Sequence, residues 1–150
     1  MTEKTLVLIK PDGVQRGLVG EVISRLEKKG LQLAAMKMMQ VDEDLASRHY
    51  QEHKDKGFYP ELVNFITSGP IVAMVWQGQD AIAQVRALMG ATDPAKADPG
   101  TMRGDFCLFV SNNLVHGSDS PESAVREIDL FFQSSEIYDY TQATAGWIGY

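Results

Sequence analysis

The sequence predicts a mixed α/β (α+β) domain in which helices cover a four-stranded antiparallel sheet. Two observations support this prediction. Short apolar runs rich in β-branched residues are typical of buried strands, and the segments between them carry apolar residues at helical spacing. The elements follow the order β-α-β-(α-α)-β-α-β-α, and removing the added helical pair leaves βαββαβ. That order, once the helix after the fourth strand is also left out, is typical of the ferredoxin-like split βαβ fold, with a doubly wound parallel sheet as the alternative.

The composition suits a single domain over residues 1–150. Hydrophobic residues make up 44% of the chain, enough for a full-sized core at this length. The net charge of −6 argues against nonspecific nucleic-acid binding, although a few local cations can still hold a phosphate substrate. Cys107 is the only cysteine, so we expect no intrachain disulfide and a cytoplasmic location. No apolar run approaches the length of a membrane helix, so no membrane partner is expected.

The first half of the chain provides two strands and a helix. Residues 5–9 form an apolar run predicted to be a central strand, which ends at the segment that begins with Lys10 and Pro11. The next glycines are predicted to form a turn, because their spacing matches no phosphate-binding loop. A helix then extends to Gly30, and residues 31–41 form the second strand. The glycines of the predicted turn are Gly13, Gly17 and Gly20. The methionines of the second strand, Met36, Met38 and Met39, are predicted to fill the core.

A helical pair, a strand and another helix follow. Asp42 is predicted to cap a helix that runs to about residue 51, and a short helix covers residues 62–67. Residues 71–77 form the third strand, and a helix from Asp80 to Gly90 comes after it. Residues 91–113 form a long segment rich in turn residues, with a helical turn near residues 102–107, and such ordered loops are often functional.

A second pattern in the helical pair points to different chemistry. The segment from His49 to His53 has the spacing His-x-x-Glu-His, with Glu52 as its carboxylate, and so matches the motif of inverted zinc peptidases. The two histidines would share one face of a helix. A five-residue pattern is weak evidence, and an exposed helix face is the preferred interpretation.

The most informative stretch is Asn-Leu-Val-His-Gly-Ser-Asp-Ser at residues 113–120. Residues 114–116 are predicted to form the fourth strand, and Ser120 to cap a helix that begins at Pro121. The apolar residues of that helix, which ends near residue 132, are Val125, Ile128, Phe131 and Phe132. His116 therefore lies between a buried strand and a helix N-terminus, where α/β-type domains hold anions. An uncharged imidazole in that place is a nitrogen nucleophile.

This stretch resembles the active-site signature of nucleoside diphosphate kinases, and the similarity extends over the whole chain. Residues 5–12 resemble the opening strand of that family, and residues 89–94 and 100–106 resemble its nucleotide loop. The resemblance implies reversible transfer of the γ-phosphate of a nucleoside triphosphate such as ATP to a nucleoside diphosphate. The transfer would be ping-pong through a phosphohistidine on His116, with broad base specificity. Mg²⁺ would be held mainly by the nucleotide phosphates, not by the protein.

The resemblance also implies roles for individual residues. His116 would attack through Nδ1, Glu127 would orient the imidazole, and Ser118 would support both. Lys10 and Tyr50 would reach the transferred group, and Asn113 would bind a ribose hydroxyl. The remaining members of the nucleotide site would be Arg86, Arg103 and Thr92 on the phosphates, Phe58 stacked on the base, and Leu62 and Val110 lining its slot.

The C-terminal tail points to assembly. From residue 134 onward its large apolar residues include Tyr138, Tyr140, Trp147, Ile148 and Tyr150, and we do not expect so apolar a tail to float free. The resemblance implies a homo-oligomer, with a hexamer built as a trimer of dimers favoured over a tetramer or dimer. Two other functions remain as alternatives: the zinc peptidase, and a catalytically silent interaction module on the same fold.

Overall fold

Four strands pair in the order β2-β3-β1-β4 in the computed structural model, which describes residues 2–150. Each neighbouring pair of strands is antiparallel. This is the predicted ferredoxin-like sheet, and the antiparallel pairing excludes the doubly wound alternative. The strands are β1 (Thr2–Ile9), β2 (Gln32–Met39), β3 (Ile71–Gln79) and β4 (Val115–Gly117).

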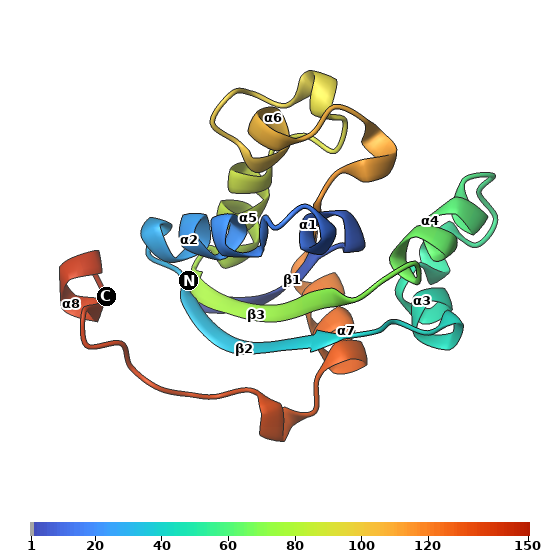
Figure 1. The fold of residues 1–150 in the computed structure, drawn as a ribbon. Helices are drawn as coiled ribbons and strands as arrows, with labels where there is room; N and C mark the ends of the chain where they lie inside the picture. The colour runs from blue at the N-terminus through green and yellow to red at the C-terminus, as the bar shows by residue number, and fades with distance from the viewer. Residues whose placement is uncertain (1) are drawn as a thin grey trace.

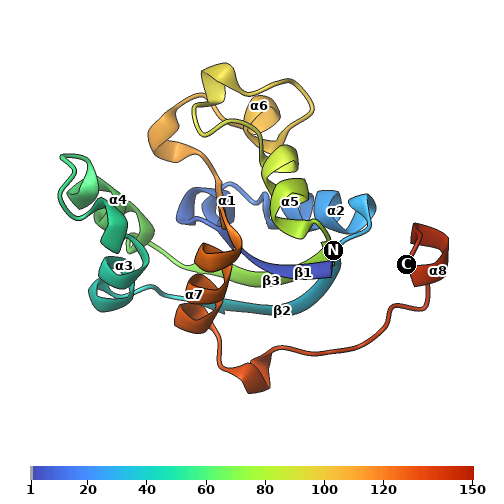
Figure 2. The same cartoon turned by 180° about the vertical axis from the view of Figure 1, so that it is seen from behind.

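Helices cover both faces of the sheet, and short helical segments fill the connections. Figures 1 and 2 show α1, α2, α5 and α6 on one side, α7 on the other, and α3 with α4 beyond one end of the strands. The helices are α1 (Pro11–Gln15), α2 (Val19–Lys29), α3 (Glu43–His49), α4 (Tyr59–Ile66), α5 (Ala81–Met89), α6 (Met102–Phe106), α7 (Pro121–Phe131) and α8 (Ala145–Ile148). Single 3₁₀ turns are η1 (Gln51–His53), η2 (Pro94–Lys96), η3 (Val110–Asn112) and η4 (Ser134–Glu136). No described helix is long and apolar enough to cross a membrane.

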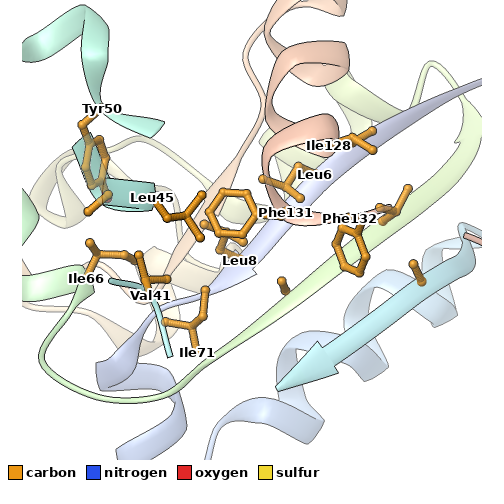
Figure 3. Close-up of a cluster of buried hydrophobic side chains, with 14 of the residues drawn as sticks. Leu6, Leu8, Val41, Leu45, Tyr50, Ile66, Ile71, Ile128, Phe131 and Phe132 are labelled. Carbon is orange, nitrogen blue, oxygen red and sulfur yellow. The ribbon is translucent and has the colours of Figure 1, made fainter. Parts of the chain in front are cut away.

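The central strand β1 contributes to two hydrophobic clusters, one on each face of the sheet. Leu6 and Leu8 pack with α3, α4 and α7 in one cluster, part of which is drawn in Figure 3. Val7 and Ile9 point the other way and pack with α2, α5 and α6. Successive side chains of a strand point to opposite faces, so an unbroken apolar run is what a strand covered on both faces requires.

Several predicted boundaries are confirmed by their caps. The backbone N–H of Leu45 donates to the Asp42 side chain at 2.8 Å, and that of Ser123 donates to the Ser120 hydroxyl at 3.1 Å. Gly30 ends α2 with φ of +105°, a conformation that favours glycine.

Other predictions of local structure are wrong. The glycine-rich segment contains the short helix α1, and of its three glycines only Gly17, with φ of +70°, lies outside a helix. Met36 and Met38 are exposed because β2 is an edge strand. Val125 is also exposed, since Ala124 occupies the buried face of α7 in its place.

Candidate active site

The site is built around His116 on β4, which pairs with Leu8 of the central strand. Directly opposed residues of an antiparallel pair project on the same side of the sheet, so the imidazole faces α7. There its Nε2 lies 3.0 Å from Oε1 of Glu127, which is almost fully buried. The contact places the ring between β4 and the middle of α7, whereas the sequence predicted a position at the N-terminus of that helix.

Ser118 ties Glu127 to the sheet. Its hydroxyl donates to Oε1 of Glu127 at 2.7 Å and accepts the backbone N–H of Leu6 at 3.3 Å. Burial by itself would raise the pKa of Glu127, but the hydrogen bonds from His116 and Ser118 hold that pKa below its usual value. The carboxylate therefore stays ionised and accepts the Nε2 proton.

The turn before β4 is held by the turn after β1. The backbone N–H of Lys10 donates to the carbonyl of Leu114, and the N–H of Leu114 donates to the carboxylate of Asp12 at 3.0 Å. Leu114 has φ of +76°, which is strained for a leucine, and these two bonds hold it there. Sequence reasoning missed Asp12 as a positioning residue, and the positive φ removes Leu114 from the predicted fourth strand.

Two buried cations, Lys10 and Arg103, bind the residues on either side of Leu114. Lys10 donates from Nζ to Oδ1 of Asn113 at 2.9 Å. Burial, and then the charge of Arg103, lower the pKa of Lys10 to about 8. Arg103 donates to the carbonyls of Asn113, Gly90 and Val115 at 2.7–3.1 Å. Burial is also the main cause that lowers its pKa to about 10, so both side chains are cationic at neutral pH.

The other predicted phosphate and ribose contacts lie around these cations. Arg86 on α5 is exposed and donates to the carbonyl of Gly117 at 3.3 Å. Thr92 is exposed, and its carbonyl accepts a 3.3 Å bond from the Asn113 amide. Both the oxygen and the nitrogen of the Asn113 amide therefore already form hydrogen bonds. The ribose hydroxyl that this residue is expected to bind would have to share one of these two atoms.

The predicted base slot lies in two separate segments. Phe58, just before α4, is about half exposed, with the ammonium of Lys56 5.6 Å from its ring centroid. Leu62 on α4 is half-buried, and Val110 in η3 is exposed. Figure 1 shows the segments carrying α4 and η3 projecting beyond the same end of the sheet. The three side chains are accessible, as a stacking platform requires.

His49, the last residue of α3, and Tyr50, which follows it, line the same pocket as His116. Tyr50 is buried, and burial raises the pKa of its phenol to about 12. His49 is buried as well, with its ring centroid 4.6 Å from that of His116. The preferred interpretation of the His49 segment as an exposed helix face is therefore wrong. Helical spacing could have revealed this, because His49 follows the buried Leu45 by four residues.

The family model for nucleoside diphosphate kinase matches residues 3–137. The chain belongs to the nucleoside diphosphate kinase family. It is 58% identical over 148 residues to the nucleoside diphosphate kinase of Natronomonas pharaonis, covering 98% of this chain and 97% of that one. It is 56% identical over 146 residues to the enzyme of Listeria monocytogenes, covering 97% and 99%.

Solved structures of the same family superpose closely on this fold. A nucleoside diphosphate kinase from Halobacterium salinarum, in complex with CDP, has a TM-score of 0.96 at 52% identity and covers 99% of each chain. A family protein from Babesia bovis has a TM-score of 0.94 at 44% identity and covers 97% of this chain and 99% of its own. These matches make the chain an enzyme of the phosphotransferase class.

Membership of the nucleoside diphosphate kinase family favours neither alternative function. The peptidase motif also does not lie on one helix: α3 ends at His49, and His53 lies in the next 3₁₀ turn, with its ring 5.7 Å from that of Phe58. His49 faces His116 instead. The two histidines of the motif therefore do not form the paired helical face that the peptidase interpretation assumed.

Proposed function

We propose that His116 carries the phosphoryl group in reversible transfer from ATP, or another nucleoside triphosphate, to nucleoside diphosphates. The observation that supports this most is the hydrogen bond between Nε2 and Glu127 at 3.0 Å. An ionised carboxylate fixes the proton on Nε2, so the lone pair resides on Nδ1. Nδ1 attacks the γ-phosphorus, a P–N bond forms, and the P–O bond to the departing diphosphate breaks. The second nucleoside diphosphate reverses these steps and takes the phosphoryl group.

The cations near His116 suit the charge of the substrate. Lys10, Arg86 and Arg103 supply positive charge, and phosphoryl transfer depends mainly on positioning and charge neutralisation. These side chains, with Thr92 and Asn113, are cationic or neutral, whereas Mg²⁺ prefers carboxylate and phosphate oxygens. The donor set therefore fits an Mg²⁺ ion held by the nucleotide phosphates, where it would neutralise their charge. Tyr50 and Ser118 complete the proposed site.

Labelling with γ-labelled ATP tests this proposal. The intact chain should become labelled in the absence of acceptor, and the label should be lost in acid and kept in alkali, as expected for phosphohistidine. Added nucleoside diphosphate should then remove the label and form labelled triphosphate. A chain that turns over without ever carrying label would contradict the proposal.

Replacement of Glu127 with glutamine should slow transfer and leave nucleotide affinity nearly unchanged. An amide oxygen still accepts the Nε2 proton but offers no negative charge to the positive charge that forms on the ring. We expect kcat to fall by up to about 10⁴-fold, the loss that the same change causes at a carboxylate that orients a catalytic histidine. Stopped-flow labelling measures the effect, and Glu122→Gln, an exposed carboxylate on the same helix, is the control. A loss of affinity alone would contradict the positioning role.

Purine and pyrimidine diphosphates should all be phosphorylated. Phe58 offers a ring face, and Leu62 and Val110 offer only apolar contact, so nothing in this set reads base edges. A preference above tenfold requires more than about 1.4 kcal/mol. Parallel kinetics with ADP, GDP, CDP and UDP measure it, and complete rejection of one base would refute this slot.

We also propose that the enzyme is cytoplasmic and assembles into a homo-oligomer, with a hexamer favoured. The tail supports assembly only in part, because it binds back to its own sheet. The Tyr140 hydroxyl donates to the carbonyl of Leu33 at 2.6 Å, and the Tyr150 hydroxyl accepts from the backbone of Gln79 at 2.9 Å. Trp147 remains 93% exposed, which leaves a large apolar side chain for a neighbouring subunit to cover.

Deletion of residues 140–150 should lower stability and favour smaller species. The loss of the two tyrosine hydrogen bonds accounts for about 1–3 kcal/mol per chain. Thermal melting and light scattering measure the two effects, with Tyr150→Phe as a control that removes one bond only. A full-length monomer at micromolar concentration would overturn the oligomer proposal.

A further inference from the structure

All three histidines of the chain, His49, His53 and His116, line one small pocket of about 90 Å³. His49 is only 4% exposed, yet neither of its ring nitrogens has a hydrogen-bond partner among the described residues. Buried polar atoms are nearly always paired, so an imidazole with two unpaired nitrogens calls for an explanation. The proposed phosphoryl transfer makes no use of His49.

The unpaired imidazole is directed at two further ligand-type side chains. The rings of His49 and His116 meet edge to face, at an angle of 81°. One ligand atom from each of His49, His116 and Glu127 can be chosen so that all three lie within 4.8 Å of one another. Two imidazoles and one carboxylate are a ligand set typical of zinc sites that keep a fourth position open.

We propose that His49, His116 and Glu127 form an inhibitory site for a borderline divalent transition-metal ion such as Zn²⁺. The inhibitory part rests on the proposed role of His116. The ion would replace the proton shared by Nε2 of His116 and Glu127, and that proton would leave to solvent. With His116 and Glu127 both bound to the ion, Nδ1 would be a poor nucleophile.

The distances favour this exchange. Zinc bonds to nitrogen and oxygen are about 2.1 Å, so tetrahedral ligand atoms lie about 3.4 Å apart. Nε2 of His116 and Oε1 of Glu127 are already 3.0 Å apart. The His49 nitrogen lies within 4.8 Å of the other two ligand atoms, so the His49 ring has to move closer by roughly 1.4 Å at most. Arg126, 3.8 Å from the other oxygen of Glu127, opposes a cation and will keep the affinity moderate.

The chemistry also separates this site from the ion that accompanies the nucleotide. The site offers two imidazole nitrogens, from His49 and His116, and one carboxylate oxygen, from Glu127. Imidazole suits Zn²⁺ and Cu²⁺, whereas Mg²⁺ takes oxygen ligands. Mg²⁺ should therefore leave the pocket free.

Titration calorimetry of the nucleotide-free, untagged protein with Zn²⁺ tests the site. We expect one ion per chain, with His49→Gln weakening binding at least tenfold and His53→Gln leaving it unchanged. His53 is the matched control because it lines the same pocket and belongs to the sequence motif but not to the spatial group. Equal losses in both variants, or no loss in His49→Gln, would overturn the proposal.

His116→Ala gives a second test that does not depend on a buried substitution, because the His116 side chain is 23% exposed. It too should lose at least tenfold in Zn²⁺ affinity, and wild-type affinity would overturn the site. Zn²⁺-loaded wild-type protein should also take label from Mg²⁺–ATP at least tenfold more slowly, with recovery on adding enough EDTA to chelate the Zn²⁺ while Mg²⁺ stays in excess.

Labelling with Mg²⁺ present and Zn²⁺ absent separates the two proposals. A chain that forms phosphohistidine but binds no Zn²⁺ refutes only the metal site. A chain that binds Zn²⁺ through His49 and His116 but is never labelled retains the metal site and refutes the proposed function.

Discussion

Replacement of His116 with alanine should abolish the labelled intermediate and reduce turnover by roughly 10⁴-fold or more. The substitution removes the only atom proposed to hold the phosphoryl group between the two half-reactions. The fold should persist, because β4 remains paired with β1 through its backbone and Glu127 keeps the hydrogen bond from Ser118. Labelling with γ-labelled ATP and coupled-assay turnover measure the two losses.

Circular dichroism and thermal melting are needed beside these assays to show that the variant is folded. His53→Gln is the matched control, since it removes a histidine from the same pocket without touching the proposed nucleophile. That variant should still become labelled. If His116→Ala were labelled as strongly as the wild type, another residue would be the nucleophile and the mechanism proposed above would be refuted.

The order of strands and helices could be predicted because each element carries a strong local signal. The apolar run of β1 is covered on both faces, and the caps at Asp42, Ser120 and Gly30 mark helix ends that the structure confirms. The exposure of Met36 and Met38 could not be predicted in the same way. The sequence of an apolar strand does not show whether the strand lies at the centre or at the edge of a sheet. Only the order in which the strands pair places β2 at the edge.

The site shows a similar division. The motif around His116 singled out the histidine, and the family resemblance implied Glu127 and Ser118. In the structure Glu127 contacts both His116 and Ser118. His49 and Asp12 contact segments that are far from them in the sequence. No local pattern predicts that α3 brings an imidazole against His116, or that Asp12 holds the strained backbone of Leu114. In α7 the apolar Val125 was wrongly predicted to be buried. The buried face of the helix instead includes the acidic Glu127, and a buried carboxylate is itself a sign of function.

Arg103 has a larger structural role than a phosphate clamp needs. Three of its five N–H groups donate to the carbonyls of Gly90, Asn113 and Val115, which joins the end of α5 to both sides of Leu114. It is 5% exposed, so these carbonyls have little access to replacement water. Its two remaining N–H groups are the ones free to meet phosphate oxygens in the proposed function.

Replacement of Arg103 with alanine should therefore destabilise the fold by about 3–5 kcal/mol and also abolish transfer, because it leaves two buried acceptors and one part-buried acceptor without their charged donor. Arg103→Lys should recover only part of the stability, since an ammonium cannot reach three divergent carbonyls. Arg86→Ala is the matched control: Arg86 is exposed and makes one 3.3 Å bond, so its loss should weaken phosphate binding but change stability by less than about 0.5 kcal/mol. Urea unfolding and steady-state kinetics on the three variants separate the two roles. An Arg103→Ala variant as stable as Arg86→Ala would show that the carbonyl contacts do not hold this loop.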